Sequence, residues 1–223
     1  MINIKEKVSL IVCAYNEERN IQPVLDFLDS VKWLDQVIIV NDGSTDKTAE
    51  IIKSYTKFDL IEHKVNQGKG AAIASGVKAS RNDLLIFLDA DLVGLRESHL
   101  FTMLSPVLFT KEADLALGIF GKGEISVTNF ANKLVPSITG QRVIRKRMLP
   151  SLNNLENQKY GVDITITKSV AEDRVRVVKL DGLSQVIKEE KDDKLMHAVK
   201  KRVIMYMDIY KSVKNSKKVK IIK

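Results

Sequence analysis

Two carboxylates separated by one alanine follow an apolar run, and this spacing suggests metal and phosphate chemistry. Residues 84–88 are all large and apolar, and Asp89-Ala90-Asp91 comes directly after them. Such a run is typical of a strand that is buried on both faces in a parallel sheet. Because an ionised carboxylate is costly to bury, both acids should emerge beyond the strand end, where open α/β sheets bind ligands. Their oxygens would suit Mg²⁺ or Mn²⁺ carrying a substrate phosphate.

Strands and helices alternate up to these acids, which predicts the fold class. The pattern favours strands at Val8–Cys13, Asp35–Val40, Asp59–His63 and Asp83–Leu88, with helices at Asn20–Ser30, Asp46–Tyr55 and Ala71–Ala79. Regular β-α alternation predicts an α/β protein with a mainly parallel, right-handed, doubly wound sheet. The carboxyl ends of these strands then share one edge.

Polar groups at three strand ends would meet at that edge. They are Tyr15-Asn16-Glu17, Asp42 and the pair Asp89/Asp91. Asp42 can accept hydrogen bonds from a base N–H or a ribose hydroxyl, while Lys69 and a metal would hold a diphosphate. Two familiar nucleotide sites are excluded, because the chain lacks both G-x-x-x-x-G-K-[ST] and G-x-G-x-x-G. The sequence therefore argues against a P-loop NTPase and a dinucleotide-dependent dehydrogenase.

The second half is less regular. It predicts helices at Glu97–Phe109 and Val127–Val135 and strands at Ala113–Phe120 and Arg174–Leu180, the last of them half-exposed. Pro136–Arg145 is expected to be a polar loop that ends in a basic run, and the type of Tyr160–Ala171 is left open. Asp192–Ser212 has the periodicity of a long amphipathic helix. No repeat or Gly/Ser linker divides the chain, so one domain is the simplest expectation.

Composition is that of a globular protein with a basic end. The net charge of the 223 residues is +8, and residues 188–223 hold twelve Lys/Arg against five Asp/Glu. Solubility, an anionic membrane surface or nucleic acid could explain such a tail, although few aromatic residues are available for base stacking. The single cysteine, Cys13, and the lack of a signal-peptide layout or an 18-residue apolar run lead us to expect a cytoplasmic location. Contact of the tail with the inner membrane face is a further possibility.

Four motifs in order resemble those of family 2 glycosyltransferases with the GT-A fold. They are Val8–Glu18, Val40–Asp46, Asn66–Ala72 and Phe87–Asp91. Ser137–Arg142 and Tyr160–Asp163 are similar to later segments of glucosyl-3-phosphoglycerate synthases and polyprenyl-phosphate sugar transferases. The resemblance implies one GT-A (Rossmann-like) domain over residues 1–223, with a mixed, mainly parallel sheet flanked by helices. Residues 1–95 would form the nucleotide-sugar half, 96–187 the acceptor half and 188–223 a basic helical tail.

The resemblance also implies roles for individual residues. Those expected at the nucleotide are Ala14, Tyr15, Glu17, Asp42, Lys69, Asp89 and Ala90. Asp89 and Asp91 would bind Mg²⁺ or Mn²⁺, while Gly140, Gln141, Arg142 and Arg145 would face the acceptor. Asp163 is the positional candidate for a catalytic base. Relatives often carry a metal-binding histidine after the last strand, where this chain has Gln185, so a third protein ligand is not assigned.

The activity implied is metal-dependent transfer of a sugar from a UDP- or GDP-sugar to an acceptor hydroxyl or phosphate. The acceptor could be a small anion such as phosphoglycerate, held by the loop Gly140–Arg145, or a polyprenyl phosphate approached through the basic tail. Neither the sugar nor the stereochemistry follows from the sequence, and a homodimer is possible. Two alternatives stay open: a nucleotide-sugar-binding domain that has lost catalysis, and a nucleotidyltransferase. A nucleotidyltransferase usually needs a loop rich in glycine and arginine, and residues 14–20 offer only Arg19.

Overall fold

The structure, a computed structural model, describes residues 6–121, 136–158 and 161–186. The first part of the chain alternates strands and helices, as predicted: β1 Val8–Ala14, α1 Ile21–Ser30, β2 Gln36–Asn41, α2 Thr48–Lys53, β3 Asp59–Glu62, α3 Lys69–Ala79 and β4 Leu84–Asp89. The second part is more broken: β5 Leu92–Val93, α4 Glu97–Leu104, a π-helical turn Ser105–Phe109, β6 Leu115–Phe120, a 3₁₀ turn Pro136–Ile138, β7 Arg142–Arg145, a 3₁₀ turn Lys146–Met148, α6 Leu152–Glu156, α7 Val162–Lys168, a 3₁₀ turn Glu172–Arg174, β8 Val175–Leu180 and β9 Ser184–Gln185. The predicted helices at 127–135 and 192–212 lie outside the described residues.

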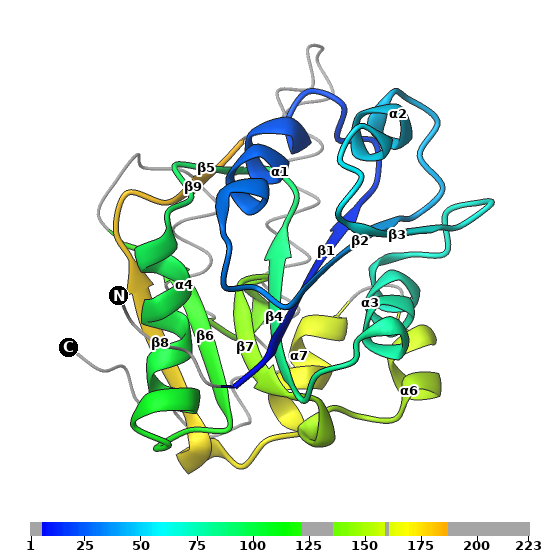
Figure 1. The fold of residues 1–223 in the computed structure, drawn as a ribbon. Helices are drawn as coiled ribbons and strands as arrows, with labels where there is room; N and C mark the ends of the chain where they lie inside the picture. The colour runs from blue at the N-terminus through cyan, green and yellow to red at the C-terminus, as the bar shows by residue number, and fades with distance from the viewer. Residues whose placement is uncertain (1–5, 122–135, 159–160, 187–223) are drawn as a thin grey trace, which may run out of the picture.

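One seven-stranded sheet runs through both halves of the described chain, in the order β3-β2-β1-β4-β7-β6-β8 (Figure 1). The strands β3, β2, β1 and β4 are parallel, as expected for a doubly wound sheet. β7 is antiparallel to both β4 and β6, while β8 pairs with β6 in parallel. The fold class predicted from the sequence, a mixed and mainly parallel sheet flanked by helices, is confirmed.

Alternate residues of β4 pack on opposite faces of the sheet, which explains its uninterrupted apolar run. Leu84, Ile86 and Leu88 join the core beneath α1, α2 and α4. Leu85 and Phe87 join the other core, beneath α3, α6 and α7. All five side chains are buried. Each face of the sheet therefore supplies a separate apolar layer, and the first polar side chain of β4 is Asp89 at its carboxyl end.

The expectation of a polar loop over Pro136–Arg145 is wrong for its last four residues. Arg142–Arg145 form β7, a central strand between β4 and β6. The apolar pair Val143 and Ile144 is fully buried, one residue in each core. Four residues with arginine at both ends carry too little periodicity to be read as a strand, because the neighbours that pair with them come from elsewhere in the sequence.

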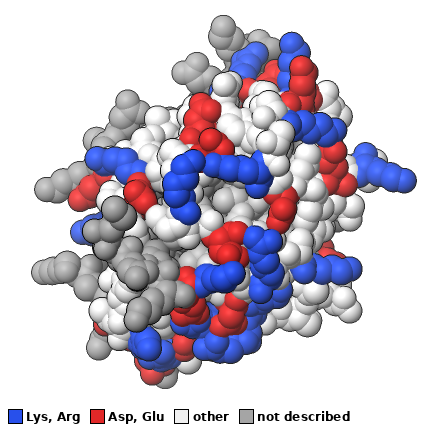
Figure 2. Space-filling view, in the orientation of Figure 1, with Lys and Arg blue, Asp and Glu red and all other residues white. Residues whose placement is uncertain are grey.

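The helix expected at Glu97–Phe109 is α-helical only to Leu104, and Ser105–Phe109 continues as a π-turn that contains Pro106. A proline cannot donate to the preceding turn, which accounts for the change. Acidic and basic side chains are interspersed on the face shown in Figure 2. Among the described residues, none of the helices has the length and hydrophobicity that a membrane-spanning segment requires.

Candidate functional site

Asp89, the last residue of β4, is enclosed by the turn that leads into β7. The Gln141 side chain donates from Nε2 to Asp89 Oδ2 at 2.7 Å, and the Thr139 hydroxyl donates to Gln141 Oε1 at 2.7 Å. Gly140 lies directly against the carboxylate, since a β-carbon there would come within 2.2 Å of both Asp89 oxygens. The predicted acceptor residues Gly140 and Gln141 therefore position Asp89.

Lys69 lies beside the other oxygen of Asp89. It is the first residue of α3, and its Nζ is 3.2 Å from Asp89 Oδ1 and 3.1 Å from Asp163 Oδ2. Burial lowers the pKa of Lys69, but the charges of Asp163 and Asp89 outweigh this and raise it overall. Burial likewise raises the pKa of Asp89, and Lys69 and Gln141 overcome this and lower it. Both groups are therefore charged at neutral pH.

Asp91 lies just beyond the strand end and is in a different electrostatic situation. Burial, followed by the nearby charge of Asp89, raises the pKa of Asp91 to about 7, although a hydrogen bond from Gln185 opposes the shift. That bond runs from Gln185 Nε2 to Asp91 Oδ1 at 2.7 Å. Glu17 adds to the negative charge around Asp91. A cation at this position would relieve the repulsion.

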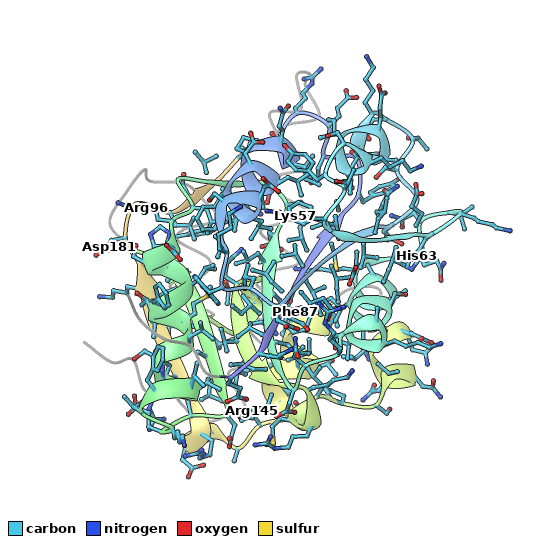
Figure 3. All side chains as sticks on the ribbon, in the orientation of Figure 1. Lys57, His63, Phe87, Arg96, Arg145 and Asp181 are labelled. Atoms are coloured by element: carbon cyan, nitrogen blue, oxygen red, sulfur yellow. The ribbon has the colours of Figure 1, made fainter. Side chains whose placement is uncertain are left out.

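A short ribbon positions Gln185. β5 and β9 pair antiparallel, with Leu92 opposite Gln185. The turn before β9 is fixed from α4, because Arg96 Nη2 donates to the Asp181 carbonyl at 2.7 Å and His99 Nε2 contacts the same oxygen at 3.0 Å. Figure 3 shows the labelled Arg96 and Asp181 next to each other. These contacts link the β8 end to Asp91.

The end of β1 and the turn after it supply three of the predicted nucleotide residues: Ala14, Tyr15 and Glu17. Ala14 is buried, and its carbonyl accepts a hydrogen bond from the Asp42 N–H at 2.9 Å. Tyr15 has 43% of its surface exposed, the largest exposure among the predicted site residues. Glu17 is nearly buried, with Asn20 Nδ2 donating to its Oε2 at 2.9 Å. Tyr15 is thus the residue here that is free to stack on a ligand.

Asp42 is buried and its carboxylate organises the loop before α3. Oδ1 accepts from Gln67 N at 3.0 Å, and Oδ2 accepts from Gly68 N at 2.8 Å. His63 Nδ1 lies 2.7 Å from Oδ1, and its Nε2 lies 2.9 Å from Ser75 Oγ. These contacts are internal to the protein, so the Asp42 carboxylate holds the loop that leads into α3, whose first residue is Lys69.

The structure does not bring Arg145 to this cluster. Arg145 is opposite Leu84 in the β4–β7 register, at the other end of the strand from Asp89. Its guanidinium pairs with Glu6 and lies 3.3 Å from Asp83. Figure 3 shows Arg145 at the bottom of the sheet. The predicted loop Gly140–Arg145 is therefore not a single anion-binding surface.

Arg142 and Asp163 do lie beside the cluster, in a buried ion pair. Only 1% of the Arg142 side chain is exposed, and its Nη2 is 2.9 Å from Asp163 Oδ1. Nη1 donates to the Asp163 carbonyl at 2.9 Å, and Nη2 donates to the Thr139 carbonyl. Arg142 is thus paired with Asp163, and Asp163 in turn contacts Lys69.

The carboxylates of Asp91 and Asp89 have the oxygen ligands that suit a hard divalent cation. Carboxylate oxygens are ligands that Mg²⁺ and Mn²⁺ prefer, and Asp91 is buried among negative charges that a cation would offset. Within the described ranges, no group of three His, Cys, Asp or Glu side chains is arranged to hold a metal. A metal here would need oxygens from its ligand or from water as well.

Three contributors were not predicted as site residues. His63 contacts Asp42, Thr139 orients Gln141, and Gln185 donates to Asp91. His63 carried a usable signal, because it follows the strand next to β2 at the same edge of the sheet. Gln185 carried one as well, because it stands where relatives often have a metal-binding histidine. The positions of Thr139 and Gln185 depend on how the second half of the chain folds back.

The family comparison covers most of the described chain. Residues 9–174 match the model of the family described as "Glycosyl transferase family 2". A dolichyl-phosphate beta-glucosyltransferase of Trichomonas vaginalis is 42% identical over 97 residues, which cover 38% of this chain and 30% of that protein. A poly-beta-1,6-N-acetyl-D-glucosamine synthase of Staphylococcus epidermidis is 37% identical over 92 residues, covering 40% and 22%. The match thus spans less than a third of the length of these two relatives.

Solved structures show the same fold over a greater length. A glucosyl-3-phosphoglycerate synthase of Mycobacterium tuberculosis in complex with phosphoglyceric acid has a TM-score of 0.67 and 19% identity, covering 91% of this chain and 79% of that one. The same enzyme with Mn²⁺, uridine diphosphate and glucosyl-3-phosphoglycerate has a TM-score of 0.65 and 20% identity, with the same coverage. Since the family match extends over more than half of the sequence, the chain belongs to glycosyltransferase family 2.

Proposed function

We propose that this chain transfers a hexose from a UDP- or GDP-sugar to an acceptor, with Mg²⁺ or Mn²⁺ bound at Asp91 and Asp89. The observation that carries the proposal is the grouping of Asp89, Asp91 and Lys69 at the carboxyl end of β4. Two acids and one cation at that edge match a ligand that brings both a metal and a diphosphate. Complexes of the M. tuberculosis synthase with Mn²⁺ or Mg²⁺ and uridine diphosphate support the choice.

The described residues divide the work of holding the donor. Tyr15, exposed at the end of β1, offers a ring on which a base can stack. Asp42 holds the loop before α3 in place, and Lys69 supplies a positive charge beside Asp89. A divalent cation, when bound, would stabilise the negative charge that develops on the leaving diphosphate.

For the acceptor, the arginine positions favour a polyprenyl phosphate over a small anion held by Gly140–Arg145. Arg142 is buried and Arg145 pairs with Glu6 at the other end of β7, so neither is exposed beside Asp89. The T. vaginalis relative is named for dolichyl phosphate, which agrees with this choice. Phosphoglycerate, the acid bound in the M. tuberculosis synthase, is the alternative acceptor.

A thermal-shift panel with the full chain tests the donor. UDP, GDP, ADP and their sugars are each added with Mn²⁺, with Mg²⁺ or with EDTA. We expect a rise in Tm with one nucleoside diphosphate that requires the metal and is lost in Asp91→Ala. No rise with any nucleotide, or an equal rise in EDTA, would overturn the proposal. Hydrolysis of the matching sugar nucleotide then separates a transferase from a domain that only binds.

The acceptor is tested with the donor that this panel identifies. Transfer is measured to a short-chain polyprenyl phosphate and, separately, to 3-phosphoglycerate. A full-length variant in which Lys200, Lys201 and Arg202 are changed to Gln is compared for sedimentation with anionic liposomes. Product on the lipid, with weaker sedimentation of the variant, supports the polyprenyl acceptor. Product on phosphoglycerate alone rejects it.

A further inference from the structure

Four charged side chains of alternating sign connect the two halves of the described chain. Arg142 of β7 contacts Asp163 at 2.9 Å, Asp163 of α7 contacts Lys69 at 3.1 Å, and Lys69 of α3 contacts Asp89 of β4 at 3.2 Å. The nearest sequence neighbours among them, Asp89 and Lys69, are 20 residues apart. The tertiary fold therefore assembles this row.

The two cations of the row differ in exposure. The Arg142 side chain is 1% exposed, whereas 38% of the Lys69 side chain is exposed. A buried guanidinium needs an anionic partner, and Asp163 supplies it. Lys69 can reach a ligand, and Arg142 cannot. Arg142 must therefore act through Asp163 if it affects the ligand at all.

Asp163 is poorly placed to take a proton from an acceptor. Its Oδ2 accepts from Lys69, and its Oδ1 faces Arg142 at ion-pair distance without hydrogen-bond geometry. A general base needs an oxygen directed at the acceptor hydroxyl. Both carboxylate oxygens of Asp163 lie against cations of the protein, which is the arrangement of an anchor.

We propose that Arg142 and Asp163 are positioning residues that hold the Lys69 ammonium beside Asp89, ready to meet the donor diphosphate. The proposal rests on the donor chemistry proposed above, and it replaces the role of base predicted for Asp163. A lysine stem is flexible, and fixing it costs side-chain conformational entropy. Two carboxylates that fix it before the ligand arrives remove that cost from binding.

The test is a double-mutant cycle between Asp163→Asn and Lys69→Met in the full chain. Affinity for the nucleoside diphosphate with Mn²⁺ is measured by calorimetry, and kcat and KM for the donor by transfer assay. We expect each single variant to lose donor affinity by roughly tenfold. The double variant should bind no more weakly than Lys69→Met, because Asp163 acts through Lys69.

A catalytic base would give the opposite result. Asp163→Asn would then bind the nucleotide as the wild type does, while kcat fell by about 10²–10⁴-fold. Additive losses of donor affinity in the double variant would also overturn the proposal. If Asp163→Asn alone does not fold, the pair Arg142→Gln with Asp163→Asn removes both buried charges and takes its place in the cycle. Arg142→Lys should recover part of the affinity that Arg142→Gln loses.

The same cycle is run on the free energy of unfolding, without nucleotide or metal. Coupling between Lys69 and Asp163 in unfolding supports their contact independently of the donor chemistry. If the wild type binds no nucleoside diphosphate but this coupling is present, the proposed function fails and the anchoring of Lys69 stands. If the coupling is absent, Asp163 does not anchor Lys69 and the inference is wrong.

Discussion

The α-carbon of Gly140 lies against the carboxylate of Asp89, with no room for a β-carbon between them. An ideal β-carbon at Gly140 would come within 2.2 Å of both carboxylate oxygens and 2.4 Å of Cγ. The second half of the chain thus touches the strand-end acid through a glycine. Any larger residue would have to displace Asp89 from Lys69 and Gln141.

We therefore expect Gly140→Ala to weaken donor binding by roughly ten- to hundredfold, since overpacking typically costs about 1–3 kcal/mol. Calorimetric titration with the nucleoside diphosphate and Mn²⁺ measures the loss. Gly76→Ala is the matched control, because its β-carbon would also be crowded, at 2.6 Å from Ile11 Cγ2, but inside the core. The control should lose stability without losing donor affinity. Equal affinities in both variants would contradict the prediction.

Asp91→Asn should stabilise the metal-free protein as the pH rises. Burial and the charge of Asp89 raise the pKa of Asp91 to about 7 in the folded state, above its ordinary value. A carboxyl with a raised folded pKa destabilises the protein progressively between its unfolded pKa, about 4, and its folded pKa. In EDTA, the variant should gain a few degrees of Tm over the wild type at pH 8, and less at pH 5. A Tm difference between variant and wild type that does not change with pH would contradict the raised pKa of Asp91.

Asp42→Ala should destabilise the protein and weaken donor binding without removing the metal requirement. The change leaves the Gln67 and Gly68 N–H groups without their carboxylate partner, at a cost of about 2–3 kcal/mol. Denaturant unfolding and nucleotide titration measure the two effects. Ser75→Ala, which removes only the hydroxyl that contacts His63, should cost about 1 kcal/mol and leave binding intact. Unchanged stability in Asp42→Ala would mean that the loop does not depend on this carboxylate.

Cys13 should react slowly with thiol reagents until the solution is strongly alkaline. Burial raises the pKa of the Cys13 thiol to about 12, with Asp89, Asp42 and Asp163 adding to the effect and Lys69 opposing it. Because only the thiolate reacts, the native rate should still rise about tenfold per pH unit above pH 9. In urea, where the pKa returns to about 8.5, the rate should level off. Native and unfolded rates that match at pH 8 would contradict the raised pKa.

The first half of the fold could be predicted because its signals are local. The apolar run before Asp89 is long enough to identify a buried strand, and the strand ends then share one edge by geometry. That reasoning also placed Lys69 and Asp91 near Asp89. The wider family resemblance added Gly140 and Gln141, which the structure does bring to the same acid.

The rest depends on contacts between distant segments. Arg142 and Arg145 are three residues apart, and a loop would have exposed both to one ligand. In β7, one contacts Asp163 and the other contacts Glu6, at opposite ends of the strand. A buried arginine is unusual and needs an anionic partner. The sequence around Arg142 does not indicate that this partner is Asp163. Sequence patterns alone therefore could not separate anchors from ligand contacts.

The position of β7 in the sheet has a consequence for how the chain can fold during synthesis. β7 follows β4 and β6 in the sequence but lies between them in space. Until residues 142–145 have been made, β4 has an unpaired backbone edge flanked by large apolar side chains, and β6 lacks its bridge to the first four strands. Such edges invite pairing with other chains. A fragment that ends near residue 95 would leave the β4 edge unpaired. The boundary between the donor half and the acceptor half is therefore a poor point at which to truncate the protein.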